Sequence, residues 1–167
     1  MHASSYRIMK RLIERIPRGS EPLSVLDVGS FDVNGTYRDL IPDAWSYVGL
    51  DIRPGPNVDV VVADPYNWAE LNGRQFDLVI SGQCLEHCEF PWLTANEMLC
   101  HLRVGGFAAV VAPFVQARHN HPHDYWRFLD SGLKALFCGR IDAVESGVAQ
   151  GTKQIQDAWF LGRKSKA

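Results

Sequence analysis

The chain has 167 residues, of which 46% are hydrophobic and 22% are charged, and its formal net charge is −2. This length and composition are typical of one globular domain with a sizeable core, and they exclude a disordered chain. The nearly balanced charge lacks the basic excess of a dedicated nucleic-acid-binding domain, and no apolar run is long enough to cross a membrane. We therefore expect neither nucleic acid nor a membrane among the partners of this protein.

The chain begins with an amphipathic helical pattern that Pro17 and Gly19 end. Its apolar side chains fall on one face: Tyr6, Met9, Leu12, Ile13 and Ile16. The pattern lacks the apolar core of a signal peptide, so the cysteines of the chain indicate reduced thiols in a cytoplasmic protein. We expect a single domain over residues 1–167, in which a helix within residues 1–19 is a candidate lid over a core of residues 20–167.

Short apolar runs predict five buried strands, over residues 23–29, 46–52, 58–64, 76–82 and 105–113. Helical patterns alternate with them, over residues 35–41, 65–72, 91–102 and 124–137. Two further strands, over residues 140–148 and 157–164, end the chain without a clear helix between them. This alternation predicts an α/β fold with a parallel sheet covered on both faces, to which the final pair of strands adds an antiparallel edge.

The turns that follow these strands carry the chemistry, because ligands of open α/β sheets bind at the carboxyl ends of the strands. Gly29 permits a tight turn and a close approach of the backbone to a ligand. Asp51 lies about two dozen residues after Asp27, close to the separation expected of an acid that hydrogen-bonds a ribose diol. Any single strand-end acid, Asp64 included, is more often a simple turn cap. Several such turns in order indicate a ligand site.

These motifs resemble those of the class I S-adenosylmethionine-dependent methyltransferases, over residues 23–164. LDVGSFDVNG matches the glycine-rich first motif, YVGLDI the acidic second motif and VVADPYNW the third, while FDLVISGQCLEHCEFPW and EMLCHLRVGGFAAVVAP match the fourth and fifth. The resemblance implies a Rossmann-like, doubly wound sheet of about seven strands, mostly parallel with an antiparallel C-terminal edge. It also implies methyl transfer from S-adenosylmethionine to an unidentified, small-molecule acceptor.

The same resemblance implies which residues bind the cofactor. Asp27 would help to hold its ammonium group, Asp51 would accept hydrogen bonds from its ribose hydroxyls, and Asp64 would accept one from its adenine amino group. The other residues would pass over the methionine part, pack on the adenine or line the cleft near the sulfonium: Gly29, Ser30, Phe31, Ile52, Ser81, Gln83 and Leu85. The chain departs from the family at Phe31 and Val33, which stand where further glycines are usual, so we expect a variant turn there.

Three histidines are candidates for a general base on the acceptor side: His87, which follows the fourth strand, and His119 and His123, which follow the fifth. Imidazole is suited to removing a proton near neutral pH. Each of them has a structural alternative, in which it caps a loop or lines the substrate without reacting.

Residues 119–128 read HNHPHDYWRF, and histidines at every second position raise the question of a metal site. Pro122 interrupts any regular strand, so the imidazoles need not share one face. We expect Asp124 to cap the helix predicted over residues 124–137, with Tyr125 and Trp126 in its first turn. The stretch is thus predicted as an acceptor-side loop, and no metal is expected.

Two other functions stay open. One is a non-catalytic protein that binds S-adenosylmethionine or S-adenosylhomocysteine, and the other is a nicotinamide-dependent oxidoreductase on a related fold. The missing glycines and the loop after the fourth strand disfavour the oxidoreductase, because a pyrophosphate needs close backbone approach. No insertion is large enough to form a separate substrate cap, so the site is expected to be open or completed by a second subunit of a homodimer.

Overall fold

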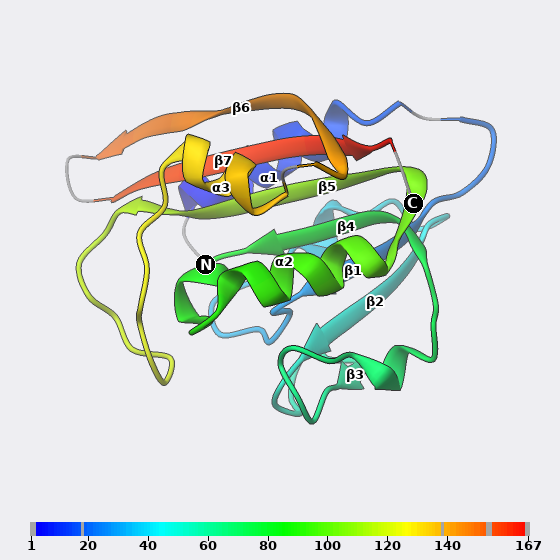
Figure 1. Ribbon diagram of the computed structural model, residues 1–167, viewed down its shortest axis with the longest axis horizontal. Coiled ribbons are helices and arrows are strands. Elements are labelled where there is room, and N and C mark those ends of the chain that lie inside the picture. Colours follow the sequence, from blue (N-terminus) through cyan, green and yellow to red (C-terminus); the bar gives the residue numbers. More distant parts are fainter. Residues whose placement is uncertain (1–2, 18, 138, 153–154, 166–167) are drawn as a thin grey trace.

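The computed structural model describes residues 3–17, 19–137, 139–152 and 155–165 (Figure 1). Its helices are α1 (Ala3–Glu14), α2 (Pro91–Cys100) and α3 (Asp130–Leu136). Its strands are β1 (Ser24–Val28), β2 (Ser46–Asp51), β3 (Val60–Val61), β4 (Phe76–Gly82), β5 (Leu102–Val115), β6 (Ile141–Thr152) and β7 (Ile155–Lys164). Three short 3-10 turns complete the set, over Arg38–Leu40, Ala69–Leu71 and Leu85–His87.

The strands form one seven-stranded sheet in the order β3-β2-β1-β4-β5-β7-β6. β1 lies between β2 and β4 and pairs with both in parallel, and β4 pairs in parallel with β5. β7 runs antiparallel to both of its neighbours, β5 and β6. The predicted fold class is therefore confirmed, including the antiparallel C-terminal edge.

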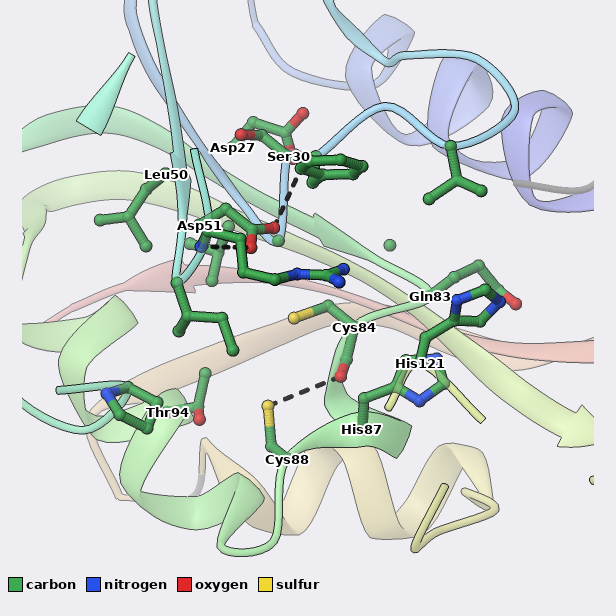
Figure 2. A pocket seen from close by; sticks show the side chains of 18 of the residues that line it. Asp27, Ser30, Leu50, Asp51, Gln83, Cys84, His87, Cys88, Thr94 and His121 are labelled. Atoms are coloured by element: carbon green, nitrogen blue, oxygen red, sulfur yellow. Dashed lines mark hydrogen bonds between the residues drawn. The ribbon is translucent and has the colours of Figure 1, made fainter. Parts of the chain in front are cut away.

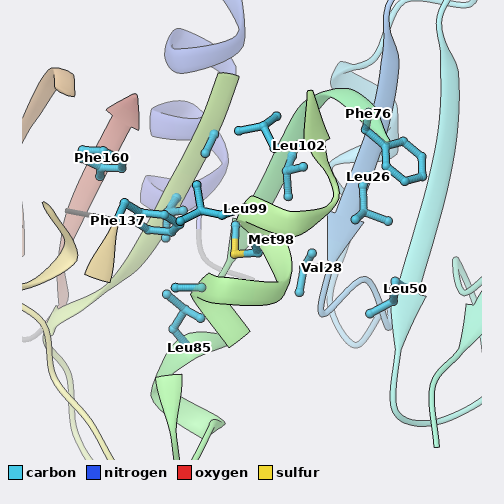
Figure 3. Close-up of a cluster of buried hydrophobic side chains, with 14 of the residues drawn as sticks. Leu26, Val28, Leu50, Phe76, Leu85, Met98, Leu99, Leu102, Phe137 and Phe160 are labelled. Carbon is cyan, nitrogen blue, oxygen red and sulfur yellow. The ribbon is translucent and has the colours of Figure 1, made fainter. Parts of the chain in front are cut away.

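Successive side chains on each strand point to opposite faces of the sheet, and they form one hydrophobic core on each face. On one face, α2 and α3 pack over a core that includes Leu26, Val28 and Phe160 (Figures 1 and 3). On the other face, α1 packs against β5, β7 and β6. Leu12 and Met9 of α1 are fully buried there. The helix predicted at the start of the chain thus covers the sheet; its role as a lid stays a prediction, and residues 1, 2 and 18 lie outside the described part.

The helix predicted over residues 124–137 is shorter than expected, because α3 begins only at Asp130. Asp124 does not cap a helix: its carboxylate accepts hydrogen bonds from the guanidinium of Arg127, at 2.6 and 2.8 Å. Tyr125 and Trp126 do not open a helix either, since their amides donate to the backbone carbonyl of Glu86, at 2.8 and 3.2 Å. A long-range contact has replaced the local helical bonds that the sequence pattern favoured.

The two short helical patterns of the first half, over residues 35–41 and 65–72, give only the 3-10 turns Arg38–Leu40 and Ala69–Leu71. The chain therefore crosses from β1 to β2 and from β3 to β4 with little helical cover. Among the described residues, no helix combines the length and the apolar character that a membrane span needs.

Candidate functional site

A cleft with a volume of about 420 Å³ opens at the carboxyl edge of β1, β2 and β4 (Figure 2). Its floor is formed by the turns that follow these strands, and its far side is closed by the loop between β5 and α3. Most of the predicted site residues line it: Asp27, Gly29, Ser30, Phe31, Asp51, Ile52, Gln83, His87, His119 and His123. Sequence positions up to 96 residues apart thus meet in one place, because parallel strands end on the same edge.

Three predicted residues do not line this cleft. Ser81 is buried, and its hydroxyl donates to the carbonyl of Val28 at 3.0 Å. Leu85 is buried in the core beneath the cleft. Asp64 is exposed and accepts a hydrogen bond from the amide of Tyr66 at 2.8 Å, so its side chain closes a turn beside the cleft.

In the turn after β1, residue 29 has to be a glycine, whereas the structure accommodates a phenylalanine at residue 31, where the family usually has a glycine. Gly29 has a φ of 78°, and a Cβ at this position would lie 2.5 Å from the sulfur of Cys84. Phe31 instead packs against Gly55, where a Cβ would lie 2.2 Å from the phenyl ring. A side chain at residue 55 would therefore collide with Phe31, and Phe31 itself lines the cleft.

Asp51 ends β2 at the entrance of the cleft. Its carboxylate accepts hydrogen bonds from the amides of Phe31 and Arg53, each at 3.2 Å. These two bonds fix the orientation of the carboxylate (Figure 2). A carboxylate has about four acceptor positions, so Asp51 retains capacity for two hydroxyl donors.

Asp27 is buried behind the turn, and the hydroxyl of Tyr47 donates to it at 2.5 Å. Burial raises the pKa of Asp27 from its ordinary value to about 7, although the hydrogen bond from Tyr47 opposes this. A cation in the cleft would favour the ionised form, because an opposite charge stabilises a desolvated carboxylate.

A second group of side chains gathers at the other end of the cleft, where Glu86, His87 and His119 face one another. Nε2 of His87 lies 3.7 Å from Oε1 of Glu86, and Nε2 of His119 lies 4.0 Å from the same oxygen. The carboxyl group of Glu86 is fully buried, and neither of its oxygens has a hydrogen-bond partner among the residues that the structure describes. Burial raises the pKa of Glu86 to about 8, and burial lowers the pKa of His87. The ring of His121 lies 5.8 Å from that of His87 (Figure 2).

Backbone contacts hold this group together across two loops. The carbonyl of Glu86 accepts the amides of Tyr125 and Trp126, and the indole nitrogen of Trp126 donates to the carbonyl of Cys88 at 2.9 Å. These bonds dock the histidine-containing loop on the segment after β4. Glu86 was not among the predicted site residues. The signal in the sequence was an acid, Glu86, next to a histidine and shortly after a buried strand. The burial of Glu86, however, depends on the docking of a loop that comes more than thirty residues later.

His123 contributes to the group through its backbone, because its carbonyl lies 2.6 Å from Nδ1 of His87. His119 is held by Asp124, whose carboxylate accepts the amide of His119 at 2.7 Å. Hydrogen bonds from Arg127 lower the pKa of Asp124, so this carboxylate stays charged. The predicted histidines therefore meet, with the imidazoles of His87 and His119 at the centre.

The model of the methyltransferase domain family matches residues 26–110 of the chain. The malonyl-[acyl-carrier protein] O-methyltransferase of Paenibacillus sp. (strain JDR-2) is 29% identical over 131 residues. That match covers 64% of this chain, which spans only 46% of the length of the relative.

Solved structures share the fold at low identity. N-methyltransferase NodS from Bradyrhizobium japonicum WM9, in complex with S-adenosylhomocysteine, has a TM-score of 0.74 at 13% identity, with 98% of this chain and 87% of that chain covered. The 1,6-didemethyltoxoflavin-N1-methyltransferase of Burkholderia thailandensis, with bound 1,6-didemethyltoxoflavin and S-adenosylhomocysteine, has a TM-score of 0.68 at 18% identity, with 98% and 78% covered. Both show that the topology described above is that of methyltransferase structures.

The buried state of Asp27 generates a prediction about stability. Because its pKa is raised in the folded protein, its stabilising effect is fullest below its unfolded pKa and is lost as the pH rises towards about 7. Asp27→Asn keeps an acceptor for Tyr47 and cannot ionise. We expect the gain in unfolding free energy of Asp27→Asn over the wild type to be larger at pH 8 than at pH 5 by about 2 to 3 kcal/mol.

Urea unfolding at the two pH values measures this difference. Asp77→Asn provides the contrast: hydrogen bonds from Ser24 and Arg103 outweigh partial burial and lower the pKa of Asp77, so this variant should lose stability at pH 8. If Asp27→Asn raised the unfolding free energy equally at both pH values, Asp27 would not be a neutral, buried group whose pKa is raised.

Proposed function

Because the chain belongs to the methyltransferase domain family, we propose that it transfers a methyl group from S-adenosylmethionine to a small-molecule acceptor. The observation that carries the proposal is the cleft at the carboxyl edge of the sheet, with the oriented carboxylate of Asp51 at one end and the histidine group at the other. S-adenosylmethionine, when bound, supplies a methyl group whose bond to sulfur breaks, with the electron pair staying on sulfur, as a lone pair of the acceptor bonds to carbon.

Asp51 is our candidate to accept hydrogen bonds from the ribose hydroxyls, because two of its acceptor positions are already used for orientation and the rest are free. Ile52 follows directly; it is half-exposed and lines the cleft, which suits packing against the adenine. Gly29 and Ser30 would pass along the methionine part, where Asp27 would ionise opposite the ammonium group. The contact of Asp64 with the adenine amino group stays a prediction.

The acceptor would lie beside Glu86, His87 and His119. Hydrogen bonding at Nδ1 of His87 leaves its Nε2 atom with a free lone pair, which can take up a proton or bind a cation. The aromatic rings of Phe31, Tyr66 and Tyr125 also line the cleft, so a small, partly apolar acceptor fits this environment. A cytoplasmic location and a homodimer that completes the open side remain parts of the proposal.

A non-catalytic binder of S-adenosylmethionine and a nicotinamide-dependent oxidoreductase are the alternatives. Calorimetric titration with S-adenosylmethionine, S-adenosylhomocysteine and NAD separates the oxidoreductase from the other two. We expect both sulfur compounds to bind at one site per chain and NAD not to bind. Binding of NAD alone would contradict the proposal, and binding of S-adenosylhomocysteine without methyl transfer across a broad acceptor screen would favour the non-catalytic alternative.

Asp51→Ala tests the placement of the ribose. Hydrogen bonds to a charged carboxylate contribute about 1.5 to 3 kcal/mol each, so the loss of the carboxylate should weaken S-adenosylhomocysteine binding by at least about tenfold. Asp64→Ala is the comparison, because it removes an exposed acid from the turn that follows the next strand, β3. Calorimetry measures both affinities. An unchanged affinity in Asp51→Ala would refute its role, and weaker binding in Asp64→Ala would support the adenine contact.

A further inference from the structure

We propose that Glu86, His87 and His119 form a binding site for one divalent transition-metal ion at the acceptor end of the cleft. The inference rests on the proposed function for its chemical purpose, but the ion site itself is defined by the geometry of these three side chains. Their potential ligand atoms all lie within 4.8 Å of one another.

The surroundings of Glu86 favour an ion site. Its carboxyl group is fully buried, and both of its oxygens lack a hydrogen-bond partner among the described residues. A buried polar group without a partner costs free energy, and an unpaired carboxylate costs more than a neutral group. Such a group calls for a ligand. The two imidazoles that face it are the nearest basic groups, and neither is close enough to satisfy it directly.

The distances between Glu86 and the two imidazoles also favour an ion site. Separations of 3.7 and 4.0 Å between Oε1 of Glu86 and the two Nε2 atoms are longer than a hydrogen bond. Atoms that each lie about 2.1 Å from a shared ion are separated from one another by roughly 3 to 4.2 Å. Both oxygen–nitrogen separations therefore fall in the range expected around a shared ion and outside the range of a direct hydrogen bond.

The contacts of the second ring nitrogen in each imidazole are those of a metal ligand. Histidine ligands of metals nearly always donate their other ring N–H to a carbonyl or carboxylate, which presents the remaining nitrogen to the ion. Nδ1 of His87 lies 2.6 Å from the carbonyl of His123. Nδ1 of His119 lies 3.3 Å from the carbonyl of Ala117 and 3.5 Å from the carboxylate of Asp124. Both Nε2 atoms are thus left as lone-pair donors, and each lies within 4.0 Å of Oε1 of Glu86.

The ligand set indicates the class of ion. Two imidazoles and one carboxylate are suited to Zn²⁺, Mn²⁺, Co²⁺ or Fe²⁺, whereas Mg²⁺ and Ca²⁺ prefer oxygen ligands throughout. Three protein ligands leave at least one coordination position open, as in catalytic zinc sites. All of the imidazoles concerned line the cleft, so the open position faces the space where the acceptor would lie.

An acceptor with a hydroxyl or carboxylate oxygen that can bind the ion would suit this placement. A metal-bound hydroxyl loses its proton to water more readily than a free one, so an oxygen acceptor would need no separate base. This proposal departs from the expectation of a metal-free loop at residues 119–128. The ligands are His87 and His119 together with Glu86, and they come from two loops, not from the alternating histidines alone.

The test uses the full chain without a polyhistidine tag, stripped with a chelator and then titrated with Co²⁺ and with Zn²⁺. Absorption of visible light reports the coordination of Co²⁺, and calorimetry gives the stoichiometry and affinity for Zn²⁺. We expect one ion per chain. Glu86→Gln and His119→Ala should each weaken binding by at least about tenfold. His123→Ala is the control, because it removes a neighbouring imidazole and retains the carbonyl that His87 contacts; it should bind the ion like the wild type.

Titration of every variant with S-adenosylhomocysteine shows whether its cleft is intact. Retained S-adenosylhomocysteine binding with loss of the ion in Glu86→Gln supports the site. Absence of ion binding by the wild type, or equal ion affinity in Glu86→Gln, His119→Ala and the wild type, overturns it. Failure to bind the ion alone leaves the proposed methyl transfer standing, whereas failure to bind S-adenosylhomocysteine alone refutes the methyl transfer and leaves the ion site.

Discussion

The parallel pairing of β1 between β2 and β4 is the constraint on which the rest of this structure depends. It forces the chain to leave three adjacent strands at the same edge of the sheet, so that Asp27, Asp51 and Gln83 surround one cleft. The two cores hold these strands rigidly from both faces. The positions of these three residues are therefore set by strand register. The turn after β1 and the loop after β5 supply the residues at the two ends of the cleft.

At one end of the cleft lies the turn after β1. At the other end, the loop after β5 docks on the segment after β4. The carbonyl of Glu86 accepts two consecutive amides from the loop after β5, and this contact draws His119 toward His87. The carboxyl group of Glu86 is buried beside this contact and has no hydrogen-bond partner in the described part of the chain. The cleft thus has two halves. One half holds the oriented carboxylates of Asp27 and Asp51 and suits a nucleoside. In the other half, the ligand atoms of Glu86, His87 and His119 lie close together.

Much of this could be predicted from the sequence, because apolar runs and strand-end residues are local signals. The strands, Gly29 and Asp51 follow from them, and the family resemblance added Asp27 and Gln83, whereas the order of the strands in the sheet comes from the structure. The start of α3 could not be predicted, because the amides of Tyr125 and Trp126 make long-range bonds in place of helical ones. Glu86 was missed for the same reason: its burial is created by tertiary docking, and no local pattern distinguishes it from a solvated loop acid.

The central claim is that one cleft holds S-adenosylmethionine against Asp51 and presents its methyl group to the group formed by Glu86, His87 and His119. A crystal structure of the protein with S-adenosylhomocysteine tests it most directly. The account predicts the ribose hydroxyls within hydrogen-bond distance of Asp51 and the sulfur atom facing His87 and His119. S-adenosylhomocysteine bound outside this cleft, or bound in it with the sulfur turned away from the histidines, would contradict the account.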